Sequence, residues 1–559
     1  METHNVNYLM DALNYFDYIN QISKEDLYKG LLGYGMFSEK LPPIFTSETL
    51  YNIRKKITIS SFSKSPTDYI RYDSMRNTNV PRSLSIPTPF SYMRLCNCLM
   101  ENWSKIQDVF KESTKGQKFK CSQIHIQKLK GKDCIFEMSH QYSDRDTSLE
   151  EIKYKLPILK QYRIDADIST CFPSIYTHAL TWALVGKSEA KAQKGNNKVW
   201  FNQLDIFCRN TKNGETNGLL IGPHTSNLLS EIILCQVDKE LVGKNYNFIR
   251  YIDDYVCYVE TYEDAEKFIL DLSNALKLYE LNINVKKTKI HKLPLMFDTE
   301  WVCKLNEFHK DIVTVDINEH FFKLTSLKNY INIAIRLANE TGDSAVYTYI
   351  IKDISNYKLG DRAKSFYIYT IHHLLLLYPY LVHWIDKYIF DVYNFNKDII
   401  AKIANDLYRI GIKKKNYEAC SFALYWSIKY KFRINDEFPE QSILSEDCIF
   451  LLLSYLKSKN ECDKDSMNLL KTHALSLKDD IDKCNYSIFR HDNFIGCFSA
   501  DKIKMSVRKY FCFNIPVYKN MAEGLFCRSP YHEEYIQTSA SGNPEGLCRS
   551  TYSFLSERR

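Results

Sequence analysis

Three aspartates occupy positions from which they could share a divalent metal ion. Asp167 lies near the end of the alternating run YRIDADI, residues 162–168, and Asp253 and Asp254 interrupt the apolar run FIRYIDDYVCYV, residues 248–259. Adjacent carboxylates in an apolar strand repel each other and are costly to bury. Mg²⁺ prefers oxygen ligands, and a metal pair stabilises the attacking and leaving oxygens in phosphoryl transfer. The pattern therefore indicates metal-dependent phosphoryl transfer.

The elements that must position these aspartates form an α+β unit. Both acidic runs are rich in Tyr, Ile and Val or alternate in polarity, which predicts strands, and a further strand is expected over residues 83–86. Between the acidic runs, residues 226–241 have apolar side chains at helical spacing, as do residues 265–276. The middle of the chain is therefore expected to combine acidic strands with amphipathic helices.

The order of five segments resembles the motifs of reverse transcriptases. They are DISTCFPSIY from Asp167 (motif A), GLLIGPHTSN from Gly218 (motif B), YIDD from Tyr251 (motif C), NVKKT from Asn284 (motif D) and, upstream, PRSLSIP from Pro81, which resembles a fingers motif. The resemblance covers residues 30 to 305. It implies fingers and palm domains and nucleotidyl transfer.

The resemblance assigns catalytic roles around the acidic residues. It implies that Asp167 and Asp253 bind Mg²⁺, or Mn²⁺ as a substitute, and that Asp254 is a nearby acidic partner. The Ile168 carbonyl is expected as a further ligand. Lys287 stands where the family has a lysine that protonates the leaving pyrophosphate, a general-acid role.

Other positions are expected to bind the incoming dNTP. Arg82, and with it Arg76, would neutralise triphosphate charge through the guanidinium group. Phe172 aligns with the residue that blocks a ribose 2′-hydroxyl, although a core Phe beneath the palm explains it equally well. Gly222 would let the backbone approach the nucleotide closely, and Ser226 would begin the following helix.

Motif B departs from the family pattern. Gly218 is expected to act as Gly222 does, but the polar stretch that usually lies between these positions is replaced by Leu219, Leu220 and Ile221. This loss argues against conventional template contact. Within the family, the chain most resembles bacterial abortive-infection (Abi-type) and related defence-associated enzymes, and that resemblance implies untemplated DNA synthesis from a tyrosine hydroxyl.

The priming tyrosine is not determined by composition, because the chain has 40 tyrosines. Tyr34 is named as a guess, since Gly33 and Gly35 on either side would let its hydroxyl enter the active site.

The second half of the chain is expected to be helical. From about Phe321 the pattern changes to successive helical segments with almost no strand alternation. The predicted domains are a reverse-transcriptase-like fingers and palm domain over 1–310, an all-α, helical-repeat-like C-terminal domain over 320–518, and an unassigned tail over 519–559. Basic and aromatic residues interleave at 413–417 and 425–433, which suits either nucleic-acid binding or a solvated helix end.

Composition sets broad limits. The 559 residues carry 74 Lys and Arg against 67 Asp and Glu, a net charge of +7 that is compatible with a nucleic-acid partner. The most apolar stretch, 371–390, contains charged and His residues and is too polar to span a membrane. The 17 cysteines form no C-x-x-C pair, which favours reduced thiols in a soluble, cytoplasmic protein. A homo-oligomer is expected.

Three functions follow from these observations. The leading hypothesis is an untemplated, protein-primed DNA polymerase in antiphage defence, with dNTPs as substrates and single-stranded DNA, covalently attached, as product. The second is a reverse transcriptase that copies a dedicated RNA. The third is an inactive nucleic-acid-binding scaffold, which the retention of all three aspartates disfavours because an idle site has no need of clustered carboxylates.

Overall fold

A four-stranded antiparallel sheet positions the acidic residues. Its order is β4 (Phe248–Tyr251), β5 (Asp254–Val259), β3 (Tyr162–Asp167) and β6 (Lys289–Lys292). The computed structural model describes residues 15–57, 65–78, 80–123, 126–128, 134–136, 152–316, 319–434 and 438–479. The predicted strands over 162–168 and 248–259 are confirmed, and the second forms a hairpin, with β4 and β5 paired on either side of a tight turn.

Helices surround this sheet and follow the predicted pattern. Those in the same segment are α7 (Cys171–Ser174), α8 (Thr177–Val185), α9 (Lys187–Ala192), α10 (Trp200–Asn210), α11 (His224–Gly243) and α12 (Tyr262–Lys277). Helix α12 packs against β3 and β5, and its buried side chains are those predicted from periodicity, among them Phe268 and Leu272. Helix α11 begins at His224, so the prediction that Ser226 starts this helix was wrong by two residues.

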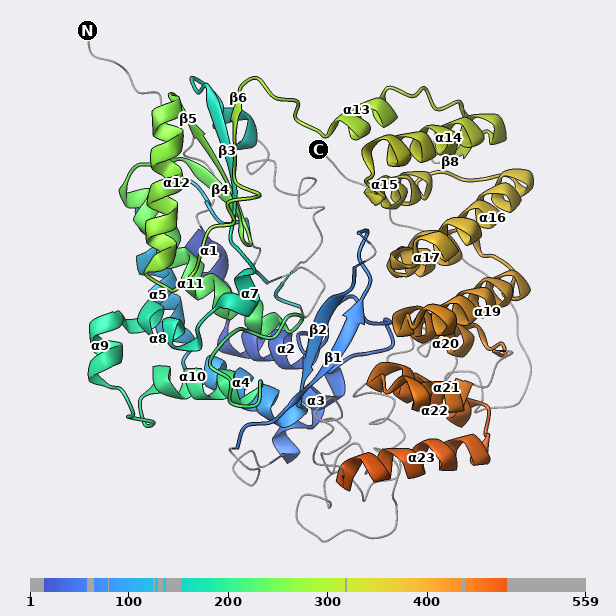
Figure 1. Cartoon of the computed structure of the whole chain (residues 1–559), viewed down its shortest axis with the longest axis horizontal. Coiled ribbons are helices and arrows are strands. Elements are labelled where there is room, and N and C mark those ends of the chain that lie inside the picture. Colours follow the sequence, from blue (N-terminus) through green and yellow to red (C-terminus); the bar gives the residue numbers. More distant parts are fainter. Residues whose placement is uncertain are drawn as a thin grey trace, which may run out of the picture.

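The N-terminal residues form a second layer beside the sheet. Its helices are α1 (Tyr15–Asn20), α2 (Lys24–Tyr34), α3 (Glu48–Ile53), the 3₁₀ turn η1 (Arg54–Lys56), α4 (Pro89–Glu101) and α5 (Trp103–Ser113). Strands β1 (Tyr69–Ser74) and β2 (Arg82–Pro87) pair as an antiparallel hairpin, which confirms the strand expected over 83–86. In Figure 1 this hairpin stands between the sheet and the C-terminal helices.

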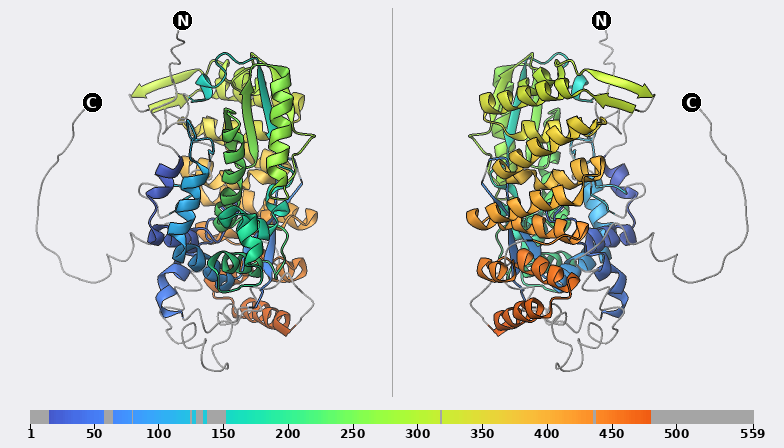
Figure 2. Two further views of the ribbon diagram at one scale, coloured as in Figure 1. Left: turned by 90° about the vertical axis from the view of Figure 1, so that its left-hand side faces the viewer. Right: turned by 90° about the vertical axis from the view of Figure 1, so that its right-hand side faces the viewer.

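The C-terminal half is a stack of helices. After α13 (Glu300–Asn306) and a small hairpin of β7 (Ile312–Asp316) and β8 (Glu319–Phe322), which the sequence did not predict, the chain is helical to the end of the described residues. The elements are α14 (Leu324–Thr341), α15 (Ala345–Ile354), α16 (Asp361–Leu377), η4 (Pro379–Leu381), α17 (Val382–Ile385), the π-helical turn η5 (Asp386–Phe390), α18 (Asp391–Tyr393), α19 (Lys397–Lys414), α20 (Tyr417–Tyr430), α21 (Phe438–Ser445), α22 (Cys448–Asn460) and α23 (Lys464–Asp479). Figure 2 shows them layered in chain order, as the repeat-like prediction requires.

The β1–β2 hairpin joins the two halves. Beyond the end of β1, the Met75 amide donates a hydrogen bond to Glu418 Oε2 at 2.8 Å, and Ser344 Oγ donates to the Asn77 carbonyl at 3.0 Å. Glu418 belongs to α20 and is buried. The hairpin is therefore fixed to the helical stack, across the predicted boundary between 310 and 320. The domain boundaries themselves stay a prediction, and the tail over 519–559 lies outside the described residues.

Part of one predicted nucleic-acid-binding run is internal. Tyr425, Lys429 and Tyr430 all donate hydrogen bonds to the carboxylate of Asp386, at 2.7 to 2.9 Å. Tyr425 and Asp386 are buried, so these residues stabilise the packing of α20 on η5 rather than form an open surface.

The described part of the chain was expected to have no membrane-spanning helix and to have reduced cysteines. No helix there combines the length and the apolarity needed to cross a membrane. Its cysteines are free, and most of them are buried, as the absence of a disulfide framework predicts.

Candidate active site

Strand register brings two of the three aspartates directly opposite each other. Asp167, the last residue of β3, is the cross-strand partner of Asp254, the first residue of β5. Directly paired residues of an antiparallel sheet project to the same face. Asp253 lies in the turn before β5, and its carbonyl accepts a hydrogen bond from the Ile168 amide at 3.1 Å. The three carboxylates that the sequence singled out therefore gather at one end of the sheet.

The turn that carries Asp253 is strained. Ile252 has a φ of 57°, in the left-handed region that β-branched residues rarely adopt. Such strain persists where surrounding contacts enforce it and often marks functional sites. Here the two-residue turn of Ile252 and Asp253 reverses the chain and so places Asp253 beside the paired Asp167 and Asp254.

Burial and neighbouring carboxylates raise the pKa of Asp253 and of Asp254. Burial raises the pKa of Asp253, and the nearby charge of Asp167 adds to the effect. Burial and then the charge of Asp253 raise the pKa of Asp254 to about 6, with a further contribution from a hydrogen bond to Asp167. Lys287 opposes the shift at both residues. The site thus concentrates negative charge that a cation would stabilise.

Asp167 is held by the segment that resembles motif D. Asn284 Nδ2 donates to Asp167 Oδ2 at 2.7 Å, and the Asn284 amide donates to the Asp167 carbonyl at 2.7 Å. Lys287 Nζ lies 3.2 Å from Asp167 Oδ2. Asp167 is buried, whereas the Lys287 side chain is 67% exposed. Of the two lysines in this segment, Lys286 and Lys287, Lys287 is the one that contacts Asp167, and Asn284 is a site residue that sequence reasoning did not single out.

A buried ion network lies behind the turn. Arg250 is fully buried and pairs with Glu231 at 3.0 Å and with Asp238 at 2.7 Å, both on α11. Its Nη1 also donates to the Ile252 carbonyl at 2.9 Å. The Tyr255 hydroxyl donates to Asp238 at 3.1 Å. Sequence reasoning missed this network. The sequence feature that could have indicated it is Arg250 itself, a charged residue inside an apolar strand just before the acidic turn.

The cluster fits a divalent metal by chemistry. Within the described residues, no three His, Cys, Asp or Glu side chains already converge as a metal-binding group. Asp167, Asp253 and Asp254 nonetheless supply oxygen donors whose mutual repulsion a cation would relieve, which is the ligand chemistry of Mg²⁺ and Mn²⁺. Lys287 adds a positive charge beside this cluster, 3.2 Å from Asp167 Oδ2.

The two arginines differ in their relation to the site. Arg82 opens β2, is exposed, and its charge lowers the pKa of Asp253, so its guanidinium acts on the acidic cluster. Arg76 lies in the turn of the same hairpin, where its Nε donates to the Val80 carbonyl at 3.4 Å. Arg82 therefore lies near enough to influence the acidic cluster, whereas the contact of Arg76 to the described residues is within its own turn. The triphosphate-binding role of both arginines stays a prediction.

Phe172 packs within the core. Its side chain is 8% exposed, and its carbonyl accepts a hydrogen bond from the Leu219 amide at 2.8 Å. This contact joins α7 to the motif B segment. Packing therefore accounts for the aromatic ring at this position, and its steric role toward the ribose stays a prediction.

The glycines of motif B approach protein backbone. Gly218 has a φ of 84°, and a Cβ there would lie 2.7 Å from the Pro173 carbonyl oxygen. Gly222 has a φ of 126°, and a Cβ there would lie 3.3 Å from the Ser85 carbonyl oxygen on β2. The close approach predicted toward a nucleotide is thus made toward the chain itself, and it fixes the motif B turn between α7 and the β1–β2 hairpin.

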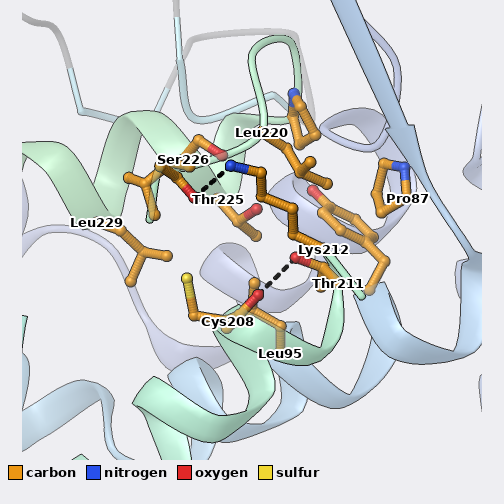
Figure 3. Close-up of a pocket in the computed structure, with 13 residues that line it drawn as sticks. Pro87, Leu95, Cys208, Thr211, Lys212, Leu220, Thr225, Ser226 and Leu229 are labelled. Carbon is orange, nitrogen blue, oxygen red and sulfur yellow. Dashed lines mark hydrogen bonds between the residues drawn. The ribbon is translucent and has the colours of Figure 1, made fainter. Parts of the chain in front are cut away.

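A half-buried lysine also shapes this turn. Lys212 on the segment after α10 donates hydrogen bonds to the carbonyls of Asn217 and, at 3.5 Å, Gly218. Figure 3 shows its side chain reaching beneath the turn, in a cavity that also contains Thr225 and Ser226. The cavity is about 10 Å³, which is room for one water molecule. It is a structural site, too small for a nucleotide.

The surroundings of Tyr34 differ from the expectation of open glycines. Tyr34 ends α2 and is half-buried. Gly33 is buried inside the helix, and a Cβ on Gly35 would lie 2.8 Å from the Cβ of His224. Gly33 packs against Tyr51 of α3, and Gly35 brings the end of α2 against the start of α11, so the premise that these glycines free the hydroxyl was wrong. The priming role of Tyr34 stays a prediction.

Comparison with known proteins agrees with the site. Residues 91–310 match the family model described as reverse transcriptase (RNA-dependent DNA polymerase). This is less than half of the chain, and it begins after the β1–β2 hairpin that carries Arg82. No curated protein matches the sequence.

Among solved structures, the chain is similar to telomerases of two yeasts. Apo telomerase from Candida tropicalis has 12% identity and a TM-score of 0.26, over 79% of this chain and 76% of that one. The Candida tropicalis telomerase in complex with a TWJ fragment of telomeric RNA has 12% identity and a TM-score of 0.25, over 68% of each chain. The corresponding Candida albicans complex has 10% identity and a TM-score of 0.27, over 76% of this chain and 65% of that one. At these scores the likenesses carry no argument.

The family match and the strand arrangement agree on the same segment. The predicted fold class, α+β fingers and palm followed by a helical C-terminal region, is confirmed. The chain contains a reverse transcriptase domain, with the general nucleotidyltransferase chemistry of that family.

Proposed function

We propose that this chain is a DNA polymerase of bacterial antiphage defence, acting in abortive infection, which extends a protein hydroxyl without a template. The observation that carries the polymerase assignment is the direct pairing of Asp167 with Asp254, with Asp253 on the turn beside them. The product is then a single DNA strand covalently attached to the protein. The defence role and the protein primer are supported by the resemblance to abortive-infection enzymes.

The site residues divide the polymerase chemistry among them. Asp167 and Asp253 would hold Mg²⁺, with Asp254 and the Ile168 carbonyl beside them, and the bound metal supplies charge neutralisation to the transferring phosphoryl group. Arg82 binds the triphosphate of a dNTP from the hairpin side. Lys287, within 3.2 Å of Asp167, is near enough to protonate the leaving pyrophosphate.

The motif B segment supports synthesis without a template. Leu219 is 6% exposed and Leu220 is 4% exposed, so neither presents a polar group to a template strand. The Ile221 carbonyl accepts a hydrogen bond from the Ser85 amide at 2.7 Å, which engages the backbone with the β1–β2 hairpin. The segment that usually carries a polar template contact therefore packs within the protein and against the β1–β2 hairpin.

The first experiment incubates the purified chain with Mg²⁺ and labelled dNTPs, without primer or template, followed by denaturing electrophoresis with and without protease and nuclease. Label that migrates with the protein supports protein priming, and mass spectrometry then tests Tyr34 against other tyrosines. Asp253→Ala should abolish incorporation. The control Glu260→Gln changes an exposed carboxylate at the far end of β5, paired with Lys160, and should retain incorporation.

A templated reverse transcriptase is the second candidate. The matched family description, an RNA-dependent DNA polymerase, favours it. If label enters DNA only after an RNA and a primer are supplied, and the product sequence follows that RNA, this candidate replaces the first. If neither condition gives incorporation with any divalent metal, the polymerase assignment itself fails.

A further inference from the structure

A groove between two helices of the C-terminal stack has the chemistry of a nucleic-acid site. It lies between α14 and α16 and has a volume of about 570 Å³. Helices α14 and α16 lie side by side in the stack (Figures 1 and 2). The groove belongs to neither the acidic cluster nor the motif B turn.

One face of α16 presents two aromatic side chains between Arg362 and His373 along the groove. Arg362, Phe366, Tyr369 and His373 follow one another at intervals of three or four residues and all line it. Such spacing places side chains on one side of a helix. The rise from Arg362 to His373, eleven residue steps, is ~16 Å along the axis, a length of a few nucleotides.

Helix α14 supplies a further cation on the opposite wall. Lys328 lies over the Phe366 ring, with Nζ 5.4 Å from its centroid. No acidic side chain lines this groove among the residues the structure describes. A solvated helix face normally mixes both signs, so the absence of carboxylates favours an anionic ligand.

The aromatic and cationic groups are open to a ligand. Tyr369 is 54% exposed, a large aromatic area to leave in water. In the described part of the chain, neither Arg362 nor Tyr369 has a hydrogen-bond or ion-pair partner. Tyr369 also lines a smaller neighbouring pocket toward α19, which carries both signs of charge, from Lys402 and Asp398, and so is not part of the proposed site.

We propose that this α14–α16 groove binds single-stranded DNA, with Arg362, Lys328 and His373 contacting phosphates and Tyr369 and Phe366 stacking on bases. Aromatic platforms between cations bind single strands with little sequence preference. The DNA would be the product of the proposed function, because a strand made without a template has no partner strand. For this source of DNA the inference rests on the proposed function. Binding itself does not require the polymerase site.

The test measures the affinity of the purified full chain for a labelled twenty-residue oligothymidylate at several salt concentrations. Tyr369→Ala should weaken binding by about 5- to 100-fold, with the salt dependence unchanged, because a stacking partner is lost. Tyr369→Phe keeps the ring and should bind as the parent does. Arg362→Gln should reduce the slope of log K against log salt by ~0.7, the value for one phosphate contact on a single strand.

Controls separate the groove from the polymerase site. Lys464→Gln removes an exposed charge at the start of α23, outside the groove, and should leave the slope unchanged. Asp253→Ala should lose incorporation yet retain groove binding, so the two proposals fail separately. Ultraviolet crosslinking of a bromouracil-substituted strand should label the peptide that contains Tyr369.

Two results would overturn the inference. One is an unchanged oligothymidylate affinity in the combined Lys328→Gln, Arg362→Gln and Tyr369→Ala variant, with crosslinks confined to the polymerase region. The other is a groove that binds polyglutamate through the same residues and does not bind oligothymidylate, since the ligand would then be an acidic protein segment. Thermal unfolding of each variant checks that these exposed substitutions leave the fold intact.

Discussion

Arg250 donates a hydrogen bond from its Nη1 to the carbonyl of Ile252, at 2.9 Å, and so ties the strained acidic turn to a fully buried ion network. The same guanidinium contacts Glu231 and Asp238 of α11. Few side chains other than arginine can reach two carboxylates and a carbonyl at once, because the planar fork presents five donors. The turn that carries Asp253 is therefore positioned by a residue that does not face the acidic cluster.

The first prediction concerns this contact. Arg250→Lys keeps a cation between Glu231 and Asp238 but cannot make all the hydrogen bonds of the guanidinium. We therefore expect dNTP incorporation to fall strongly and the free energy of unfolding to fall only slightly. Tyr255→Phe is the matched control, because it removes one hydrogen bond to Asp238 and leaves the Ile252 contact. The measurements are dNTP incorporation, Mn²⁺ affinity and the free energy of unfolding.

Complete removal of the guanidinium gives a different result. Arg250→Ala leaves two buried carboxylates without a cation to balance their charge and should cost ~3–5 kcal/mol of stability. Equal loss of Mn²⁺ affinity in Arg250→Lys and Tyr255→Phe would show that the network acts through general stability and not through the turn.

The second prediction concerns the cation beside Asp167. Lys287→Gln removes a charge that competes with a metal ion for this carboxylate, so Mn²⁺ should bind about two- to five-fold more tightly, a modest effect for an exposed ammonium. Incorporation should nevertheless fall, because the proposed general acid is lost. Electron paramagnetic resonance titration with Mn²⁺ measures the first effect, and Lys286→Gln provides the control. Weaker Mn²⁺ binding in the Lys287 variant would contradict the competition.

The third prediction concerns the packing of α2 against α11. Gly35→Ala places a Cβ 2.8 Å from His224 and 2.9 Å from the Leu31 carbonyl, and should destabilise the protein by about 1–3 kcal/mol. Gly243→Ala, at the end of α11, meets no atom within 4 Å and should be neutral or slightly stabilising. Urea unfolding of both variants measures the difference; similar stabilities would show that the helices can separate locally.

The fourth prediction concerns pH and the start of α22. Burial, with smaller contributions from Asp73 and Glu418, raises the pKa of Asp447 to about 6 from 3.8. The folded state therefore binds this proton more tightly than the unfolded state, and the stabilisation present below about pH 4 is lost as the pH rises through 6. Asp447→Asn retains the cap that accepts from the Phe450 amide.

The variant should accordingly be more stable than the parent near pH 7.5, by about 1–3 kcal/mol, and equal to it near pH 4. Paired urea titrations at the two pH values measure the change. An advantage of the variant that is the same at both values would assign the effect to something other than this ionisation.

The sequence by itself determined the acidic strands, the helices around them and the change to a helical C-terminal half. These are local properties: alternation predicted β3, the Tyr, Ile and Val content predicted strand over residues 248–259, and apolar periodicity predicted α11 and α12. That the second run folds into the β4–β5 hairpin came from the structure. The order of the motifs also predicted which carboxylates belong together, because Asp167, Asp253 and Asp254 each interrupt a strand pattern.

Tertiary structure alone decided what surrounds them. The partners of Arg250 lie 12 and 19 residues away on α11, and those of Asp167 lie 117 and 120 residues away, separations at which no periodic pattern operates. The glycines beside Tyr34 and in motif B suggested open backbone, but the folded chain fills the space next to them with His224 and with Pro173. A glycine in the sequence indicates only that another group approaches its backbone closely. Tertiary packing determines which group that is.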